Sequence, residues 1–195
     1  MRAALSGIRC FLLDMDGTFY LGDRIIEGSM EFLQKVEQTG RSYLFLTNNS
    51  SRSVQHYVEK LGRLGLHVGE DKILTSGQAA AQYLKREYPG KRVFLLGNPS
   101  LREEMEKHGI ALEDEHPDLV LVGFDTTLDY AKMTRVCDLV REGLPYIATH
   151  PDFNCPTESG FIPDIGAIMA FIEASTGRKA DVIIGKPCGE IVRAA

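Results

Sequence analysis

The sequence predicts an α/β protein with a doubly wound, largely parallel sheet. Two observations support this fold class: short apolar runs alternate with longer amphipathic stretches, and most of the runs are continuous rather than alternating. Continuous apolar runs are typical of parallel strands that are covered by helices on both faces. The alternation of strands and helices is typical of doubly wound folds with right-handed crossovers.

The apolar runs are the strand candidates. In chain order they comprise residues 10–13, 42–46, 73–75, 92–96, 119–122, 146–148 and 182–184. Cys10 opens the first run and is expected in the core. The four cysteines are far apart and form no C-x-x-C pair, so we expect reduced thiols rather than a disulfide framework.

Helices are predicted between these runs by apolar residues at a spacing of about 3.6 residues. The clearest stripe covers residues 54–64, with Ser51 as a candidate N-cap and Gly65 at the position of a C-terminal glycine. Further stripes, each followed by a glycine, cover residues 30–36, 101–105, 130–140 and 168–172. We interpret all of these stripes as core packing.

Composition limits the functional classes. With 44% hydrophobic and 25% charged residues, the chain has the make-up of a globular protein. No apolar run approaches the roughly 18 residues of a membrane span, and no secretory signal is visible. The net charge of −5 gives no basic footprint for nucleic acid. We therefore expect a cytoplasmic enzyme or binding module without a nucleic-acid or membrane partner.

The strongest chemical signal follows the first predicted strand, where Asp14 and Asp16 precede Gly17 and Thr18. Two carboxylates this close repel each other unless a cation or a proton lies between them. One of them can act as a nucleophile and the other as a general acid and base. Gly17 allows a sharp turn close to a ligand. The alternative interpretation is an Asp-Gly turn between two strands.

Polar residues also follow the second predicted strand. Thr47, Asn48 and Asn49 lie between this strand and a helix, where backbone N–H groups and the helix dipole favour an anion. The hydroxyl of Thr47 and the amide of Asn48 are candidate ligands of phosphate oxygens. The alternative is helix capping by Ser50 or Ser51.

Lys186 follows the last predicted strand, between Gly185 and Pro187. Near the carboxylates, its charge can neutralise an anionic transition state. The alternative is an exposed lysine before a turn. This segment is not a nucleotide-binding P-loop, because Ala180 and Pro187 stand where Gly and Ser or Thr are required.

In combination, three motifs resemble the first three motifs of the haloacid dehalogenase superfamily. They are Asp14-Met15-Asp16-Gly17-Thr18, Leu46-Thr47-Asn48-Asn49-Ser50-Ser51 and Gly185-Lys186-Pro187. The long separation between the second and third motifs resembles class IIA, which includes NagD-like, nitrophenylphosphatase-like and pyridoxal-phosphate-phosphatase-like hydrolases. The resemblance implies a Rossmann-like, three-layer α/β/α core formed by residues 1–77 and 180–195. It places an inserted α/β cap domain at residues 78–179.

The resemblance also implies an activity, that of a phosphatase dependent on Mg²⁺. The substrate would be a small phosphorylated metabolite such as a sugar phosphate, a nucleotide or pyridoxal phosphate. Asp14 would form an aspartyl-phosphate, and Asp16 would act as acid and then as base. The metal would bind the Asp14 carboxylate and the Asp16 backbone carbonyl. The phosphoryl group would be held by Gly17, Thr47, Asn48, Asn49 and Lys186.

The cap is expected to select the substrate. His150, Asp152 and Asn154 lie in residues 150–163, the longest segment without a predicted helix or strand, and they are candidate contacts for the leaving group. The alternative is that they are ordinary surface loop residues. The resemblance further implies a possible homodimer formed through the cap.

One departure from the superfamily concerns its fourth motif, Gly-Asp-x-x-x-x-Asp or similar, which supplies a further metal carboxylate. The nine residues after Lys186 do not contain it, and neither Asp181 nor Glu190 lies in a matching context. We therefore expect a core that is incomplete at its C-terminus. This leaves a phospholigand-binding module without catalysis as an alternative function, and phosphoryl transfer or a mutase reaction as a third.

Overall fold

The computed structural model describes residues 7–157 and 160–195. Contacts divide the chain into two compact units. The first consists of the chain up to Thr47 together with Val54–Leu74, and the second consists of Asn48–Ser53 together with Thr75–Ala195. The predicted domain boundaries at residues 77/78 and 179/180 stay a prediction.

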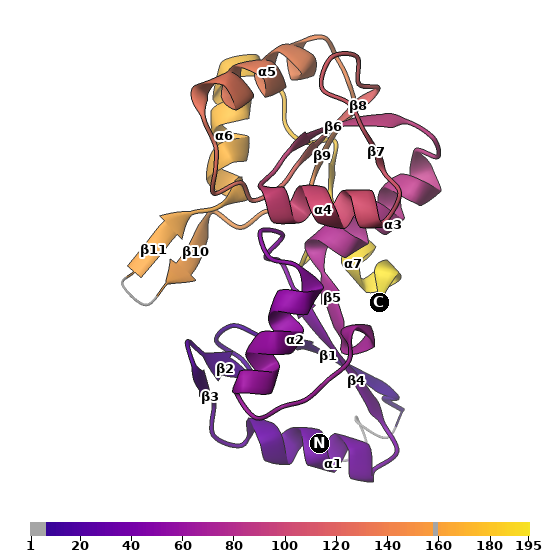
Figure 1. Cartoon of the computed structure of the whole chain (residues 1–195), viewed down its shortest axis with the longest axis vertical. Helices are drawn as coiled ribbons and strands as arrows, with labels where there is room; N and C mark the ends of the chain where they lie inside the picture. Colours follow the sequence, from indigo (N-terminus) through magenta and orange to yellow (C-terminus); the bar gives the residue numbers. More distant parts are fainter. Residues whose placement is uncertain (1–6, 158–159) are drawn as a thin grey trace. The chain divides into compact units, whose positions relative to one another are not determined.

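The first unit is built on a three-stranded sheet with the order β1-β4-β5 (Figure 1). Its strands are β1 (Cys10–Asp14), β4 (Ser42–Thr47) and β5 (Ile73–Thr75), and β1 is parallel to β4. Its other elements are the antiparallel hairpin β2 (Tyr20–Leu21) and β3 (Arg24–Ile25), helices α1 (Ser29–Gln38) and α2 (Val54–Arg63), and the 3₁₀ turn η2 (Glu70–Lys72). Phe45, Leu61 and other apolar side chains form its core.

The second unit contains a parallel five-stranded sheet with the order β12-β9-β8-β6-β7. Its strands are β6 (Arg92–Leu96), β7 (Ala111–Leu112), β8 (Leu119–Val122), β9 (Tyr146–Ala148) and β12 (Val182–Ile183). Its helices are α3 (Ser76–Glu87), α4 (Pro99–Lys107), α5 (Tyr130–Arg141), α6 (Ile165–Thr176) and α7 (Gly189–Ala194). Helices α5 and α6 cover one face of this sheet and α3 and α4 the other (Figure 1). The fold class predicted from the sequence is therefore confirmed.

Every predicted strand is present, and the glycines after the predicted helices adopt the positive φ of a helix-ending residue. Helix α3 was not predicted, because its buried face consists of small residues such as Ala79 and Ala80. Cys10 was expected in the core but is exposed, since it begins its strand.

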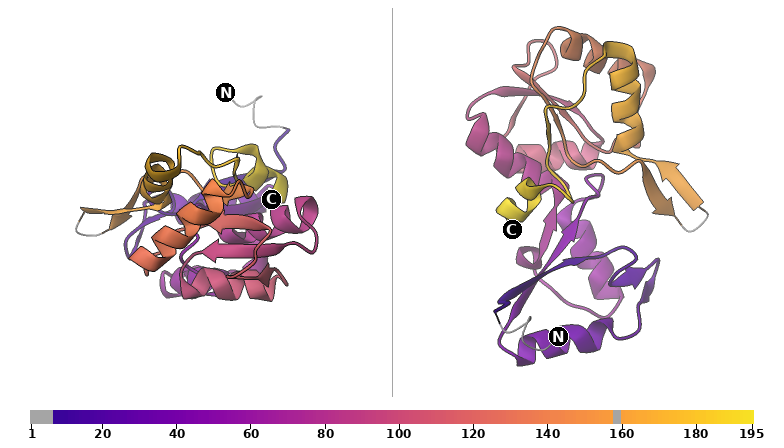
Figure 2. Two further views of the ribbon diagram at one scale, coloured as in Figure 1. Left: turned by 90° about the horizontal axis from the view of Figure 1, so that it is seen from above. Right: turned by 180° about the vertical axis from the view of Figure 1, so that it is seen from behind.

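The expectation of an irregular segment at residues 150–163 is wrong. This segment contains an antiparallel hairpin, β10 (Asn154–Thr157) and β11 (Gly160–Pro163), which projects from the second unit (Figure 2). Residues 158 and 159 of this segment lie outside the described residues. Both hairpin strands are largely exposed, so no alternation of apolar and polar residues marked them.

Within the residues that the structure describes, none of the helices has the length and apolar character needed to cross a membrane.

Candidate active site

The two carboxylates of the Asp14–Asp16 pair follow β1 in the first unit. Asp14 ends the strand and is half-buried, whereas Asp16 is exposed. Met15 between them is fully buried in the core of this unit. Side chains alternate in direction along extended backbone, so an apolar residue between two acids anchors the segment while both acids face away from the core.

A tight turn at Gly17 shapes the backbone around this pair. Gly17 has φ +77°, the left-handed conformation that favours glycine. Its N–H donates to the carbonyl of Tyr20 at 2.8 Å, and the carbonyl of Met15 accepts from Phe19 at 2.9 Å. The Asp-Gly turn considered as an alternative is thus present, and it leads into the β2–β3 hairpin. Because the Gly17 N–H donates within the turn, Gly17 helps to fix the conformation of this loop.

Three side chains that were not among the predicted site residues hold the carboxylates. The hydroxyl of Thr18 donates to Asp14 Oδ2 at 3.3 Å, and the hydroxyl of Tyr20 donates to Asp16 Oδ2 at 3.2 Å. The ammonium of Lys60, on α2, lies 3.8 Å from Asp16 Oδ1 and 4.1 Å from the centre of the Tyr20 ring. Thr18 belongs to the motif, whereas Lys60 carried no sequence signal.

The environment of Tyr20 keeps its hydroxyl protonated. Burial raises the pKa of Tyr20 far above its ordinary value, and the negative charge of Asp16 raises it further. Tyr20 is therefore a fixed hydrogen-bond donor to Asp16 throughout the range in which enzymes normally work.

A pocket of about 410 Å³ lies beside Asp14 in the first unit. This volume suits a small ligand. The pocket is lined by Leu13, Asp14, Thr18, Phe19, Ile26, Glu27, Gly28, Ser29 and Phe32. An acid at the end of a parallel strand and beside a pocket matches the general placement of ligand sites in α/β sheets.

The donor atoms of this loop fit Mg²⁺ in type. Asp14 offers a carboxylate and Asp16 a backbone carbonyl, both hard oxygen donors. In the described part of the chain, no cluster of three or more His, Cys, Asp or Glu side chains could hold a metal ion. Mg²⁺ is commonly bound through one or two carboxylates together with substrate phosphate and several waters, so this donor set is consistent with it.

The predicted phosphate ligands Thr47 and Asn48 have different surroundings. Thr47 ends β4 in the first unit and is 4% exposed. Asn48 belongs to the second unit, where its Oδ1 accepts the N–H of Lys186 at 2.7 Å. Its Nδ2 donates to the Lys186 carbonyl at 3.0 Å and to Asp152 Oδ2 at 2.9 Å. Both amide hydrogens are thus in use within the second unit, and a bond from this amide to a phosphoryl oxygen stays a prediction.

Asn49, Ser50 and Ser51 lie too far from α2 to cap it, because this helix begins only at Val54. Asn49 Oδ1 accepts from the backbone N–H and the hydroxyl of Ser51, at 2.9 and 2.8 Å. The hydroxyl of Ser50 lies 3.0 Å from that of Thr149 and accepts the N–H of Phe124 at 3.0 Å. The capping alternative for Ser50 and Ser51 is therefore wrong, because both serines are buried within the second unit.

The three predicted substrate residues, His150, Asp152 and Asn154, also have different surroundings. His150 is fully buried, and its ring nitrogens lie 3.0 Å from Thr149 Oγ1 and 3.0 Å from Asp164 Oδ1. His150 is therefore not a surface loop residue, and its contact with a leaving group stays a prediction. Asn154 is exposed on β10, and Asp152 is half-buried against Asn48. Asp164, which the sequence did not single out, is marked only by its position as the N-cap of α6.

Lys186 lies between β12 and α7, in the second unit. The neighbouring Gly185 is tightly enclosed: a Cβ there would lie 2.6 Å from Asn48 Oδ1 and 2.8 Å from the Thr149 carbonyl. Only glycine fits this position without displacing the neighbouring groups. The Gly-Lys-Pro motif therefore owes its first residue to packing against Asn48.

Comparisons with known proteins agree with these motifs. The profile of the family described as haloacid dehalogenase-like hydrolase matches residues 11–111. An acid sugar phosphatase of Staphylococcus aureus is 34% identical over 180 residues, which are 92% of this chain and 69% of that protein. The 5'-nucleotidase YutF of Bacillus subtilis is 34% identical over 177 residues, which are 91% of this chain and 69% of that protein.

A solved structure is similar over nearly the whole chain. The crystal structure of a 4-nitrophenylphosphatase from Thermotoga maritima has a TM-score of 0.93 and 48% sequence identity. The match covers 96% of this chain and 72% of that chain. The likeness to this structure is therefore one of sequence as well as of fold.

Proposed function

The chain belongs to the haloacid dehalogenase-like hydrolases, and on this premise we propose that it hydrolyses a small phosphorylated metabolite through an aspartyl-phosphate on Asp14. Its relatives are named as phosphatases and as a 5'-nucleotidase, which supports the activity of a phosphoric monoester hydrolase. The single observation that carries the mechanism is the Asp14–Asp16 pair, in which Asp14 lines a pocket and the two carboxylates are held by Thr18 and Tyr20.

The first step forms the covalent intermediate. A carboxylate oxygen of Asp14 attacks the phosphorus, and the bond between phosphorus and the ester oxygen breaks. Asp16 gives its proton to that oxygen, so the alcohol leaves in neutral form. The contact from Thr18 to Asp14 Oδ2 supports this step because it limits rotation of the nucleophilic carboxylate.

The second step releases phosphate. Asp16, now ionised, takes a proton from water, and the water oxygen attacks the phosphorus of the aspartyl-phosphate. The bond to Asp14 breaks, which restores its carboxylate and yields inorganic phosphate. Tyr20 and Lys60 orient the Asp16 carboxylate for both steps, since one donates to Oδ2 and the other lies 3.8 Å from Oδ1.

Charge neutralisation completes the proposal. Mg²⁺ would be held by the Asp14 carboxylate and the Asp16 carbonyl and would neutralise charge on the phosphoryl group. We assign Lys186 and the Thr47 hydroxyl to the phosphoryl oxygens, on the strength of their positions in the family motifs. Asn48 and Asp152 then act through the backbone of Lys186.

The substrate class is also part of the proposal. Relatives named acid sugar phosphatase and 5'-nucleotidase support a sugar phosphate or a nucleotide, and pyridoxal phosphate remains a third candidate. The cytoplasmic location, the cap boundaries at residues 78 and 179 and a homodimer formed through the cap stay predictions.

Phosphate release tests the proposal. The full chain is assayed with a sugar phosphate, a nucleoside monophosphate and pyridoxal phosphate, in Mg²⁺ and then in excess chelator. We expect turnover only with metal and its loss in Asp14→Asn. Asp23→Asn is the matched control, because Asp23 is an exposed acid in the turn of the β2–β3 hairpin.

Three outcomes separate the alternatives. Full activity of Asp14→Asn refutes the covalent mechanism. Saturable binding of a phosphate ester without turnover supports the phospholigand-binding module instead. Formation of a new phosphate ester rather than free phosphate supports a phosphotransferase or mutase.

A further inference from the structure

A second site is indicated by the strand order of the second unit. From β6 the chain crosses through α4 to β7, on one side, whereas from β8 it crosses through α5 to β9, on the other. The direction of winding therefore reverses between β6 and β8. In open α/β sheets, the crevice at such a reversal, outside the carboxyl ends of the strands, is a common ligand site.

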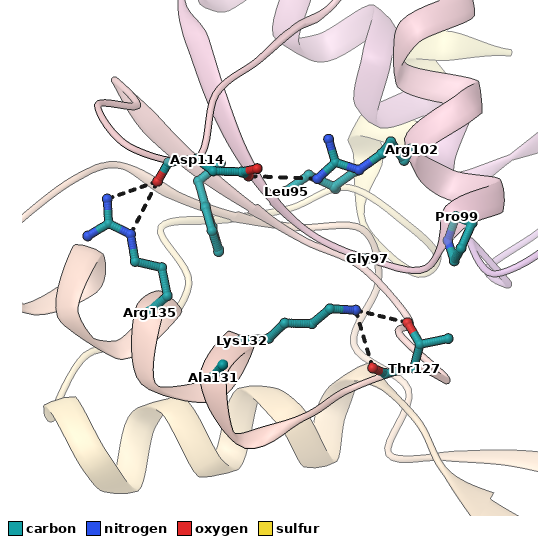
Figure 3. A pocket seen from close by; sticks show the side chains of 10 residues that line it. Leu95, Gly97, Pro99, Arg102, Asp114, Thr127, Ala131, Lys132 and Arg135 are labelled. Atoms are coloured by element: carbon teal, nitrogen blue, oxygen red, sulfur yellow. Dashed lines mark hydrogen bonds and ion pairs between the residues drawn. The ribbon is translucent and has the colours of Figure 1, made fainter.

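A pocket of about 410 Å³ is lined by residues that follow both strands of this reversal, Gly97 after β6 and Thr127 after β8, and by residues of the second unit alone. Apolar groups of Phe94, Leu95, Pro99 and Ala131 form much of its wall, and Gly97 and Thr127 also line it. Arg102, Asp114, Lys132 and Arg135 are the charged residues of the lining, so positive charge exceeds negative charge there (Figure 3).

The cations of this pocket differ in what they already bind. The Lys132 ammonium donates to Asp125 Oδ2 at 2.7 Å and to both oxygens of Thr127, which uses its three hydrogens. The side chain of Asp125 is fully buried, so Lys132 balances a buried charge. Lys132 is therefore a structural part of the wall.

The two arginines retain binding capacity. Arg135 uses Nε and Nη2 to hold the carbonyls of Asp114 and Glu115, at 2.7–3.2 Å, and its Nη1 group makes no hydrogen bond to a described residue. Arg102 has an ion pair of 3.7 Å to Asp114 Oδ1, which is longer than a hydrogen bond, and its side chain is 40% exposed. Asp114 is itself 65% exposed, so this pair is easily exchanged for a ligand.

We propose that this pocket binds a small phosphate ester that carries a flat ring, of the nucleoside monophosphate class. The guanidinium group of Arg102 offers the phosphate planar paired donors, and Arg135 adds its Nη1 group. The apolar wall receives the ring, and the volume exceeds what an inorganic ion needs. None of its lining residues is among those that line the pocket beside Asp14.

Binding is tested on the full chain labelled with ¹⁵N, by following backbone amide signals. The probe is the methylene phosphonate analogue of AMP, which a phosphatase cannot hydrolyse. Adenosine and inorganic phosphate are the partial probes. We expect saturable shifts at Gly97, Thr127 and Ala131 with the analogue, and binding at least about tenfold weaker with either partial probe.

Two substitutions of opposite effect make the test specific. Arg102→Gln is expected to weaken binding at this site about tenfold or more, and Asp114→Asn is expected to strengthen it, because it removes the carboxylate that competes for Arg102. Arg141→Gln is the matched control, since Arg141 lies at the far end of α5 and binds Asp138 and Ser175.

The proposal is overturned if the analogue shifts only signals near Asp14, or if Arg102→Gln binds it as tightly as the unmodified chain. Equal binding of inorganic phosphate would refute the role of the ring, and equal binding of adenosine would refute the role of the arginines. Asp114→Asn replaces an exposed side chain. It therefore tests whether charge on Arg102 binds the phosphate even if Arg102→Gln folds poorly.

Discussion

The side-chain amide of Asn48 holds the backbone of Lys186 from two directions. It accepts the Lys186 N–H at 2.7 Å and donates to the Lys186 carbonyl at 3.0 Å, across 138 positions of sequence. Its remaining hydrogen goes to Asp152 at 2.9 Å. The three residues form one hydrogen-bonded group within the second unit, so a change at Asp152 is expected to reach Lys186 through Asn48.

The first prediction concerns Asp152. Asp152→Ala removes the acceptor that fixes the Asn48 amide, so kcat is expected to fall about tenfold with little change in KM. Asp152→Asn keeps an acceptor oxygen and is expected to restore most of the rate. Steady-state kinetics of the two variants checks this. An equal loss in both would show that charge rather than orientation is involved.

The second prediction concerns the enclosed Gly185. Gly185→Ala places a Cβ 2.6 Å from Asn48 Oδ1, so we expect a loss of about 1–3 kcal/mol in the free energy of unfolding, together with reduced activity. Gly189→Ala is the control, because a Cβ there meets nothing within 4 Å. Urea unfolding measures both. Equal stability of the two variants would contradict the packing described around Asn48.

The third prediction concerns the buried pair His150–Asp164. Asp164→Ala removes the N-cap of α6 and leaves the fully buried imidazole without its acceptor. We expect a loss of about 2–4 kcal/mol. Asp129→Ala removes the N-cap of α5, where no buried histidine depends on the aspartate, and is expected to cost about 1 kcal/mol. Denaturant midpoints of the two variants are compared. Equal losses of stability would show that the bond between His150 and Asp164 does not stabilise the fold.

The fourth prediction concerns the hydroxyl of Tyr20. Tyr20→Phe removes the donor to Asp16 while the ring stays in the core, so kcat is expected to fall about fivefold with KM unchanged. Tyr43→Phe is the matched control, since Tyr43 packs against Phe45 in the same core. Initial-rate kinetics tests the pair. If Tyr43→Phe loses as much activity as Tyr20→Phe, the effect is general and does not come through Asp16.

The fifth prediction concerns pH. Hydrogen bonds from the Arg92 side chain and backbone lower the pKa of Asp118 to about 2. A pKa that is lower in the folded chain than in the unfolded chain stabilises the fold above the unfolded value of about 3.9, and this stabilisation is lost as the pH falls towards 2. Asp118→Asn is therefore expected to be less stable than the unmodified chain at pH 7, with a difference that shrinks below pH 4. Urea midpoints at pH 7, 4 and 3 check this, and a constant difference would exclude the ionic origin.

Much of the fold could be predicted from the sequence, because strands that are buried on both faces consist of continuous apolar residues. The run at 119–122, for example, is buried at every position of β8. Elements without such a stripe were missed. Helix α3 buries alanines and glycine, although Thr75 and Gln78 form a capping box that marks its start.

The candidate site could be predicted only where its residues are adjacent in sequence. Asp14, Asp16 and Gly17 form a local motif, and the turn at Gly17 could be predicted from these adjacent residues. The partners of Asn48 lie more than a hundred positions away, so spacing could not show that its amide is used by Asp152 and Lys186. The burial of His150 was hidden for the same reason, because its surroundings are set by Asp164 and the fold around it.

The short segment Asn48–Ser53 has a consequence for dissecting this protein. It belongs to the second unit although the chain on both sides of it belongs to the first. A fragment cut at Thr75 would lack the partners of Thr149, Asn98 and the Lys186 backbone. The second unit is therefore not a transferable module, and any excised or circularly permuted version has to carry this segment with it.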